Sequence, residues 1–271
     1  MKKVNKRNFN SAIQSYLNKL KTCNYFFCGS YDDELKYLNH HRVRYYFILR
    51  KLEDALAKYD GKNVRIMEMG FSPMSYILGY FLNIESLSIA DHNIQYRERA
   101  DKIDANFIHI DFNKEVKLSE FFDFILFHEV FEHIFCDEEK ILKTLIGCLK
   151  SDGYLFFSTP NYFSLKNLLR FFSGQSLSPL NKEIIFSDGS LHVREYGLKE
   201  ILSILSGIDN IAVTYCNYER YFDNFSSLMV YRKNKFLAAL PVLIYLIFPT
   251  FFKKMRIGIY IIIKKTNENI F

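Results

Sequence analysis

The sequence of 271 residues has no tryptophan, only 11 glycines, and an odd number of cysteines. The five cysteines lack the spacing of a zinc site or a disulfide framework, so a reducing, cytoplasmic setting is expected. The opening residues, MKKVNKRNFNSAIQSYL, have no apolar stretch of the kind that a secretory signal needs, and none is expected. The net charge of +6 is mild, and no basic run is interleaved with aromatics. Nucleic acid is therefore not expected as a partner.

A dinucleotide-binding glycine pattern is also missing. Residues 64–79, VRIMEMGFSPMSYILG, have the form of a strand, a tight turn and a helix. After Gly70, however, Ser72 and Met74 stand where a nucleotide loop would carry further glycines. Such glycines let the backbone approach a pyrophosphate, so their absence argues against an oxidoreductase that uses a dinucleotide.

What the sequence does contain is a regular alternation of apolar runs and helical patterns. Helices are predicted at 8–21, 32–59, 73–82, 93–102, 138–150 and 198–206, and strands at 64–68, 86–90, 105–110, 123–127, 154–160 and 211–216. The run MRIGIYIIIKK predicts a last strand, antiparallel at the edge of the sheet. The expected fold is α/β, a doubly wound, mostly parallel seven-stranded sheet. The expected divisions are an N-terminal helical extension (1–60), a core (61–216), and a hydrophobic insertion with the last strand (217–271).

Acidic side chains follow three successive predicted strands. Glu68, Asp91 and Asp111 lie in or directly after strands one to three, and His128 and Glu129 follow the fourth. In an open α/β sheet, ligands bind outside the carboxyl ends of the strands. Three acids would repel phosphates but suit a ligand that carries an amino group, a sulfonium and a ribose. Each acid also has a structural alternative, as a helix cap for Glu68 and Asp111 and as a turn residue for Asp91.

The motifs EMGFSP, ADHN, HIDF, FDFILFHEVFEHI, LKSDGYLFFSTPN and HVREYGLKEIL occur in this order. Together they resemble class I methyltransferases that use S-adenosylmethionine, in particular a bacterial branch with E-x-x-E-H after the fourth strand. The resemblance implies a Rossmann-like methyltransferase fold. It also implies that Glu68 and Gly70 hold the methionine end of the cofactor, Asp91 the ribose, and Asp111 the adenine amine, with Phe112 beside the ring. The expected cofactor-binding set is completed by Phe71, Ser72, His92 and His128.

Catalysis of methyl transfer to a hydroxyl needs a base. The candidates are His128, Glu129, His133 and His192, and the sequence does not choose between them. Because some relatives with E-x-x-E-H bind a divalent cation, Glu129, Glu132 and His133 are an alternative metal set. One short segment supplies too few ligands by itself, so structural roles for Glu132 and His133 are preferred and no metal is expected.

Two segments interrupt the alternating pattern. The resemblance implies that residues 161–190, between the fifth strand and the next helix, form a lid that binds the acceptor. Long insertions of this kind are usually functional or disordered. Residues 236–252 are apolar except for Thr250 and carry basic flanks. Contact with the inner membrane face, docking on the protein itself or a partner, and spanning are the alternatives, in that order.

The predicted function is S-adenosylmethionine-dependent O-methylation of a sugar, a lipid-linked glycan or another small membrane-associated acceptor. A quinone-type or other lipid phenol is the second choice of acceptor. The alternative from another class is a catalytically silent methyltransferase-like binding module, for which the sparse glycines are the support. The location expected is cytoplasmic, peripheral at the inner membrane face if 236–252 contacts the membrane.

Overall fold

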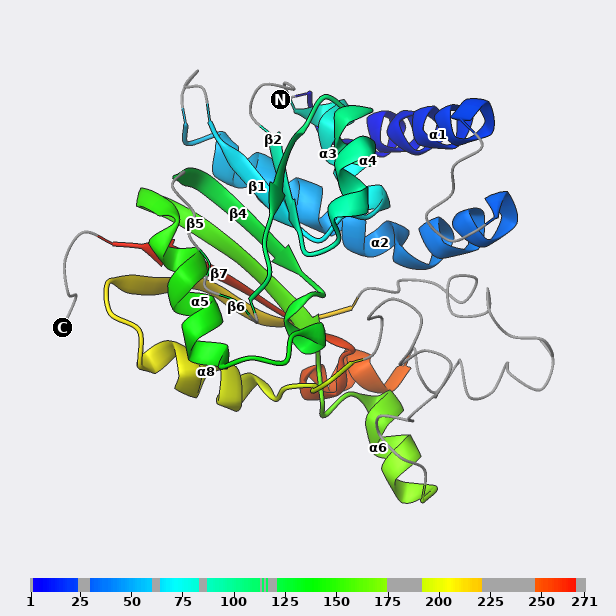
Figure 1. Ribbon diagram of the computed structural model, residues 1–271. Helices are drawn as coiled ribbons and strands as arrows, with labels where there is room; N and C mark the ends of the chain where they lie inside the picture. Colours follow the sequence, from blue (N-terminus) through cyan, green and yellow to red (C-terminus); the bar gives the residue numbers. More distant parts are fainter. Residues whose placement is uncertain are drawn as a thin grey trace.

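The computed structural model describes residues 2–23, 30–59, 64–82, 87–112, 114, 116, 121–174, 192–220 and 247–266. The chain forms a seven-stranded sheet in the order β3-β2-β1-β4-β5-β7-β6, covered on both faces by helices (Figure 1). The strands are β1 (Ile66–Met69), β2 (Leu87–Asp91), β3 (Asn106–His109), β4 (Phe122–His128), β5 (Leu149–Pro160), β6 (Ile211–Glu219) and β7 (Gly258–Lys265).

The helices agree in position with the apolar periodicity. They are α1 (Lys6–Cys23), α2 (Tyr31–Leu56), α3 (Pro73–Phe81), α4 (Arg97–Asp101), α5 (Glu138–Gly147), α6 (Leu165–Phe172) and α8 (Leu198–Ser206), with 3-10 turns η2 (Ile94–Tyr96), η3 (Phe131–His133) and η4 (Lys253–Met255). Residues 247–251 are also helical. Residues 151–153, which separate the predicted helix at 138–150 from the predicted strand at 154–160, are an irregular part of β5, with Asp152 at a φ of +65°.

The strand order places the crossover between β1 and β4. The strands β3, β2, β1, β4 and β5 run parallel, and their carboxyl ends meet at one edge of the sheet. From β1 the chain adds β2 and β3 on one side of β1, and then β4 and β5 on the other side. β1 and β4 therefore flank the topological switch point. Ligands of open α/β sheets bind there, which makes the ends of β1 and β4 the first place to look for a site.

The last strand differs from the prediction in one respect. β7 is antiparallel, as expected, but it pairs with both β5 and β6 and therefore lies inside the sheet, with β6 at the edge. The reason is visible in the side chains: Ile259, Ile261 and Ile263 are fully buried, as is Tyr260 on the other face. β6 is half-exposed along its length, as an edge strand should be.

Successive residues of each strand enter two separate cores. One core packs α1, α2 and α3 on Ile66, Ile89, Phe124, Leu126 and Phe156, and the other packs α5 and α8 on Met67, Ile125, Phe127, Leu155 and Phe157. The two-residue period of a strand explains this division. Helices α1 and α2 are also tied by a buried hydrogen bond from the Tyr16 hydroxyl to Glu34 Oε1 at 2.7 Å. The predicted N-terminal helices thus cover one face of the sheet.

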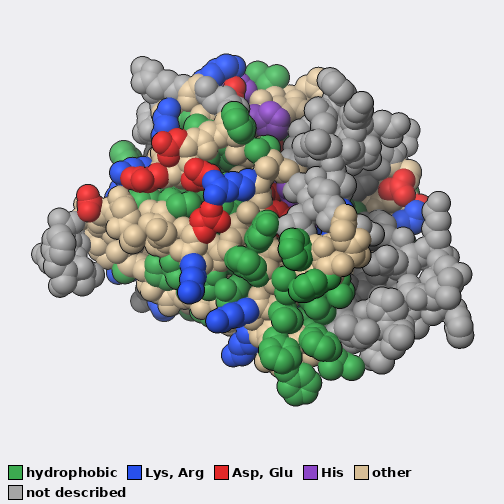
Figure 2. Space-filling view, turned by 90° about the horizontal axis from the view of Figure 1, so that it is seen from below, with side chains coloured by type: hydrophobic (Ala, Val, Ile, Leu, Met, Phe, Trp, Pro, Cys, Tyr) green, Lys and Arg blue, Asp and Glu red, His purple; other side chains and the backbone are tan. Residues whose placement is uncertain are grey.

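Only parts of the two unusual segments fall within the described residues. The expected lid is described for 161–174, and 175–190 lie outside the described residues, as do 236–246 of the apolar stretch. Among the residues that the structure describes, no helix combines the length and apolar character needed to cross a membrane. Exposed hydrophobic side chains gather on the underside of the molecule, where α6 and residues 247–252 lie (Figure 2).

Candidate active site

The turn after β1 is built around Gly70. Its φ is +82°, a conformation that favours glycine, and a Cβ at this position would lie 3.0 Å from Val130 Cγ2. Ser72 is the N-cap of α3: its Oγ accepts from Met74 N at 3.1 Å, and its own N–H donates to Ser75 Oγ at 3.1 Å. The residue that replaces a glycine in this turn therefore closes a capping box. Met74 is buried in the core with α1 and α2.

Glu68 and Asp91 lie side by side beneath this turn. Asp91 Oδ2 accepts from Phe71 N at 2.7 Å and Oδ1 accepts from Asn93 N at 2.8 Å, so the carboxylate links the turn after β1 to the end of β2. Glu68 is 5% exposed, and its Oε2 has no hydrogen-bond partner among the described residues. Burial raises the pKa of Glu68 to about 8; the Ser75 hydroxyl opposes this rise and the Asp91 charge adds to it.

The remaining predicted cofactor residues differ in exposure. Phe71 stacks on Tyr96, with ring centroids 5.4 Å apart, and His92 is exposed, with its Nδ1 3.3 Å from Asp91 Oδ1. Asp111 is half-buried and pairs with Lys114 at 3.1 Å. Phe112 is buried against Phe127 in the core. The structure therefore brings Glu68, Gly70, Phe71, Ser72, Asp91 and His92 together, with Asp111 at the end of the neighbouring strand.

His128 ends β4 as a half-buried residue whose two ring nitrogens are shielded from solvent. Its ring stacks on Tyr260 at 5.4 Å, and neither ring nitrogen has a hydrogen-bond partner among the described residues. Burial, together with the charge of Arg44, lowers the pKa of His128 to about 3. A group with this pKa is a poor base near neutral pH, which argues against His128 as the catalytic base.

Glu129 is held by two partners. Its backbone has a φ of +55°, its Oε1 accepts from Ser158 Oγ at 2.9 Å, and its Oε2 lies 3.2 Å from Arg44 Nη1. The ion pair is largely buried, and it joins α2 to the turn after β4. A positive φ in a non-glycine residue is uncommon and tends to occur at functional sites. Glu129 is thus oriented by side chains from α2 and β5.

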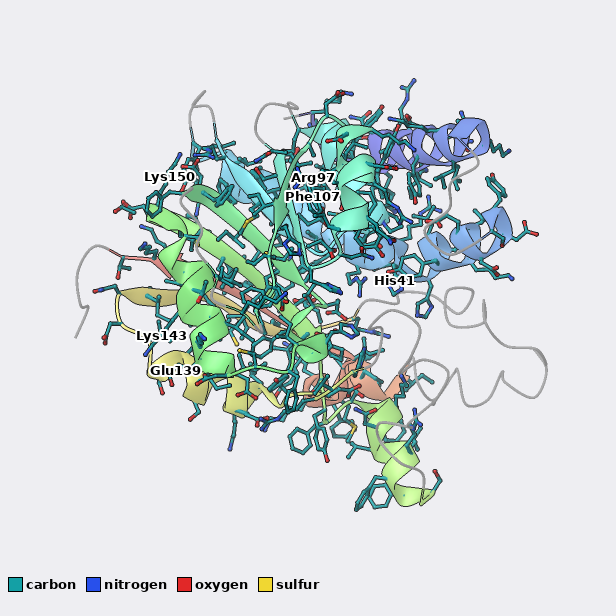
Figure 3. All side chains as sticks on the ribbon, viewed as in Figure 1. His41, Arg97, Phe107, Glu139, Lys143 and Lys150 are labelled. Atoms are coloured by element: carbon teal, nitrogen blue, oxygen red, sulfur yellow. The ribbon has the colours of Figure 1, made fainter. Side chains whose placement is uncertain are left out.

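A cavity of about 260 Å³ opens beside this turn. Helix α2 contributes His41, shown in Figure 3, and further walls come from the turn after β4, the end of β5 with α6, and the segment before α8. The full lining is Tyr37, His40, His41, Arg44, Glu129, Glu132, His133, Pro160, Asn161, Ser164, Lys166, Asn167, His192, Glu195 and Ile257. All of these except Pro160 and Ile257 carry a polar side chain. The cavity is therefore suited to a hydrophilic molecule.

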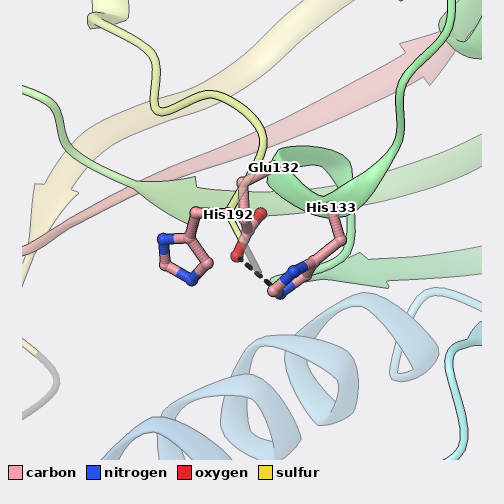
Figure 4. A group of neighbouring side chains, drawn as sticks. All are labelled: Glu132, His133 and His192. Atoms are coloured by element: carbon pink, nitrogen blue, oxygen red, sulfur yellow. Dashed lines mark ion pairs between the residues drawn. The ribbon is translucent and has the colours of Figure 1, made fainter. Parts of the chain in front are cut away.

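Glu132, His133 and His192 form a cluster in this cavity (Figure 4). One ligand atom from each lies within 4.8 Å of the others, and the two imidazole rings are 4.9 Å apart. Glu132 Oε2 accepts from Thr159 Oγ1 at 3.0 Å, and burial raises the pKa of Glu132, to which Glu129 adds. Three such groups have the ligand number of a catalytic metal site, so the cluster could hold a divalent cation. Glu129, which the sequence placed in the alternative metal set, is not part of it.

His192 is oriented by a carboxylate that sequence reasoning missed. Its Nδ1 lies 3.0 Å from Glu195 Oε1, and Glu195 Oε2 accepts from the buried Asn167 of α6. Burial raises the pKa of Glu195, but the hydrogen bonds from His192 and Asn167 outweigh it and leave the pKa below its usual value. The sequence suggested that Arg194 and Glu195 pair with each other or with the expected lid at 161–190, and Glu195 does contact Asn167 of that segment. Arg194 instead contacts Glu138 and Glu200.

Comparison with known proteins identifies the family. The sequence profile of the methyltransferase domain family matches residues 38–184, more than half of the chain. The chain belongs to this family. The methyltransferase match begins within α2, the helix that forms one wall of the cavity. No curated protein matches the sequence.

Solved structures place this methyltransferase in a known fold. The plantazolicin methyltransferase BamL, in complex with a triazolic desmethylPZN analog and SAH, is 17% identical, with a TM-score of 0.54, over 98% of this chain and 100% of that one. A putative methyltransferase in complex with the Haloferax volcanii Trm112 activator is 11% identical, with the same TM-score of 0.54, over 80% of this chain and 89% of that one. The Rossmann-like methyltransferase fold expected from the sequence is thereby confirmed.

Proposed function

We propose that this methyltransferase transfers the methyl group of S-adenosylmethionine to a hydroxyl of a hydrophilic acceptor bound in the cavity between α2 and α6. The observation that carries the proposal is the position of the cavity. It begins at Glu129, directly after β4, and the predicted cofactor residues lie at the ends of β1, β2 and β3. Donor and acceptor would then meet at the topological switch point, where open α/β sheets bind ligands.

The residues at the ends of these strands fit S-adenosylmethionine. Gly70 has no side chain, so a ligand can approach its backbone closely. The buried Glu68 Oε2 has no hydrogen-bond partner among the described residues, so a cationic ligand would displace none of them. Asp91 retains carboxylate lone pairs beyond its two backbone bonds, as ribose hydroxyls require. In this proposal Asp111 contacts the adenine amine. The cofactor supplies an electrophilic methyl group, so the protein has to align the acceptor and exclude water.

His192 is our candidate for the base that takes the acceptor's proton. The Glu195 carboxylate only accepts hydrogen bonds, so the bond between them places the proton of His192 on Nδ1. The Nε2 atom is then left as an acceptor, and the neighbouring His133 ring lies 4.9 Å from the His192 ring. Arg44 keeps Glu129 in place at the entrance from the cofactor side.

The lining of the cavity supports the proposed class of acceptor. Nearly every side chain there offers a hydrogen bond, which suits a sugar or another polyhydroxylated group better than a lipid phenol. We therefore retain a sugar or a lipid-linked glycan as the acceptor, with contact to the inner membrane face through 236–252. This assignment is consistent with the resemblance of Glu129 to His133 to the E-x-x-E-H motif of the bacterial branch.

The test is transfer of a labelled methyl group. Membrane and glycan extracts from cells lacking the protein are incubated with the purified protein and S-adenosylmethionine whose methyl group is deuterated. Mass spectrometry should find the label on the oxygen of a glycan or glycolipid. Glu195→Gln should lower the turnover roughly 10²-fold, as expected when a base is disoriented. Glu139→Gln is the matched control, because that carboxylate pairs with Lys143 on the surface of α5 (Figure 3). Label only on nitrogen or carbon would contradict the proposal.

A second candidate mechanism comes from the same cluster. If Glu132, His133 and His192 hold a divalent cation, the acceptor hydroxyl would be activated by the metal and not by His192. Chelator treatment separates the two. Full activity after removal of divalent cations, unchanged when a divalent cation is added back, favours the base. Loss of activity that a divalent cation restores favours the metal.

A further inference from the structure

The underside of the molecule carries a hydrophobic patch that the methyl transfer does not explain. It is made by Leu169, Phe171 and Phe172 of α6 and by Phe248, Phe251 and Phe252 of the 247–252 segment. Phe172 is 80% exposed and Phe251 is 78% exposed. Figure 2 shows hydrophobic side chains gathered on the underside of the molecule, where α6 and residues 247–252 lie. Scattered exposed hydrophobic residues need no explanation, but a contiguous cluster of large ones usually marks a binding surface.

Hydrogen bonds from Asn161 join the two parts of the patch. Asn161, just before α6, donates its side-chain amide to the carbonyl oxygens of Lys254 at 2.8 Å and Arg256 at 2.7 Å. Its own N–H donates to Ile257 O at 2.8 Å. Asn161 is buried, so these bonds are protected from water. The two segments that carry the patch are therefore held together by hydrogen bonds.

Every charged side chain within the two segments that carry the patch, 161–174 and 247–266, is basic. Lys166 and Arg170 lie on α6, and the exposed Lys253 and Lys254 follow Phe252 directly. Residues 161–174 and 247–266 contain no aspartate or glutamate. A protein partner or a second copy of this chain would have to supply a matching acidic and apolar surface. An anionic lipid bilayer supplies both, since its headgroups attract lysine and arginine and its acyl boundary accepts phenylalanine.

We propose that α6 and residues 247–254 form a docking surface for an anionic membrane. The phenylalanines enter the boundary between headgroups and acyl chains, and the four basic side chains contact the lipid phosphates. This surface extends beyond the 236–252 stretch, because half of it belongs to α6. It also adjoins the cavity, since Lys166 and Asn167 line the cavity on the same helix. If the proposed function holds, an acceptor could keep its lipid part in the bilayer while its polar part reaches His192.

The absence of tryptophan from the chain allows a direct test. Phe172→Trp places a single tryptophan in the patch, and Phe121→Trp places one at an exposed position before β4, at the opposite edge of the sheet. Vesicles of phosphatidylglycerol and phosphatidylcholine should shift the emission of the Phe172→Trp protein to shorter wavelength and leave that of Phe121→Trp unchanged. Pure phosphatidylcholine vesicles should shift neither. Equal behaviour of the two proteins, or no shift with anionic vesicles, would overturn the proposal.

Sedimentation with the same vesicles gives the second measurement. Phe171→Ser combined with Phe251→Ser should weaken binding at least about tenfold, and Lys253→Gln with Lys254→Gln about as much at low salt. Phe121→Ser should bind as the wild type does. Unchanged melting temperatures show that the variants are folded, whereas a large loss of stability in the double phenylalanine variant would mean that the chain itself covers the patch. If the wild type is a dimer and the double phenylalanine variant is a monomer, the patch would instead bind a second copy of the chain. Either of these two results, the loss of stability or the loss of the dimer, would overturn the proposal. Vesicle binding does not require methyl transfer, so it can fail or succeed independently of the proposed function.

Discussion

Glu68→Gln should stabilise the cofactor-free protein at neutral pH. Glu68 is buried at the end of β1, and burial raises its pKa to about 8, against an ordinary value of 4.5. The unfolded chain therefore releases this proton at a lower pH than the folded protein does. Stability from this group is fully present below about pH 4.5 and is lost as the pH rises toward 8.

The size of the effect follows from the two pKa values. At pH 7 the unfolded carboxyl lies about 2.5 pH units above its pKa, and each unit corresponds to about 1.36 kcal/mol. Keeping Glu68 protonated in the folded state thus costs about 3 kcal/mol at pH 7. Glutamine has nearly the same shape and no ionisable proton. The variant should recover most of that cost and lose the pH dependence that comes from this position.

The assay is urea unfolding of the wild type and Glu68→Gln between pH 5 and pH 9, without cofactor. Glu98→Gln, at an exposed position of α4, is the control. The two stability curves should diverge as the pH rises, with the variant the more stable. Parallel curves for all three proteins would refute the raised pKa. With cofactor present the order should reverse, because a cationic ligand favours the ionised carboxylate, and binding at pH 7 should release a proton.

Two further changes test the turn after β1 and the end of β4. Gly70→Ala should lower the free energy of unfolding by about 1–2 kcal/mol and weaken cofactor binding, because the φ of +82° strains alanine and its Cβ would lie 3.0 Å from Val130 Cγ2. Gly147→Ala, with open space around its Cβ, is the control. Equal effects of the two substitutions, measured by thermal unfolding and calorimetry, would contradict the account. His128→Phe should resist acid better than the wild type. The pKa of His128 is lowered to about 3, so its contribution to stability falls as the pH drops below about 6.5, by about 2 kcal/mol at pH 5. Equal losses in the two proteins between pH 7 and pH 5, measured by urea unfolding, would argue against a buried neutral imidazole.

The sequence predicted the sheet because its strands are short apolar runs with clear turns between them. The runs around Ile66, Ile125 and Phe156 are buried on both faces, so no alternation was needed to recognise them. The position of β7 was missed, because a run of isoleucines says that a strand is buried but not which strands flank it. That information resides in the long-range pairing with β5 and β6.

The cofactor side of the site was more accessible to prediction than the acceptor side. Glu68, Asp91 and Asp111 follow strand ends, and the carboxyl ends of parallel strands meet at one edge. By contrast, Arg44 lies on α2 in a sequence stretch that reads as the polar face of a helix. Its contact with Glu129 spans 85 positions in the chain and leaves no local signal.

Glu195 was missed for a related reason. The nearby Arg194 offered an obvious partner in the sequence, but in the structure that arginine turns toward Glu138 and Glu200. Glu195 instead forms hydrogen bonds with His192 and with Asn167 of α6. The segment before α8 is held against η3, where Glu132 O accepts a hydrogen bond from Val193 N at 2.7 Å. The sequence signal that could have indicated the pair is the spacing of three residues between His192 and Glu195.

Titration calorimetry with S-adenosylmethionine and its demethylated product tests the central claim most directly. The account predicts that the wild type binds both, that Asp91→Asn weakens both at least tenfold, and that Asp101→Asn, at the exposed end of α4, binds as the wild type does. Folded wild-type protein that binds neither ligand, or an Asp91 variant that binds as tightly as the control, would contradict it.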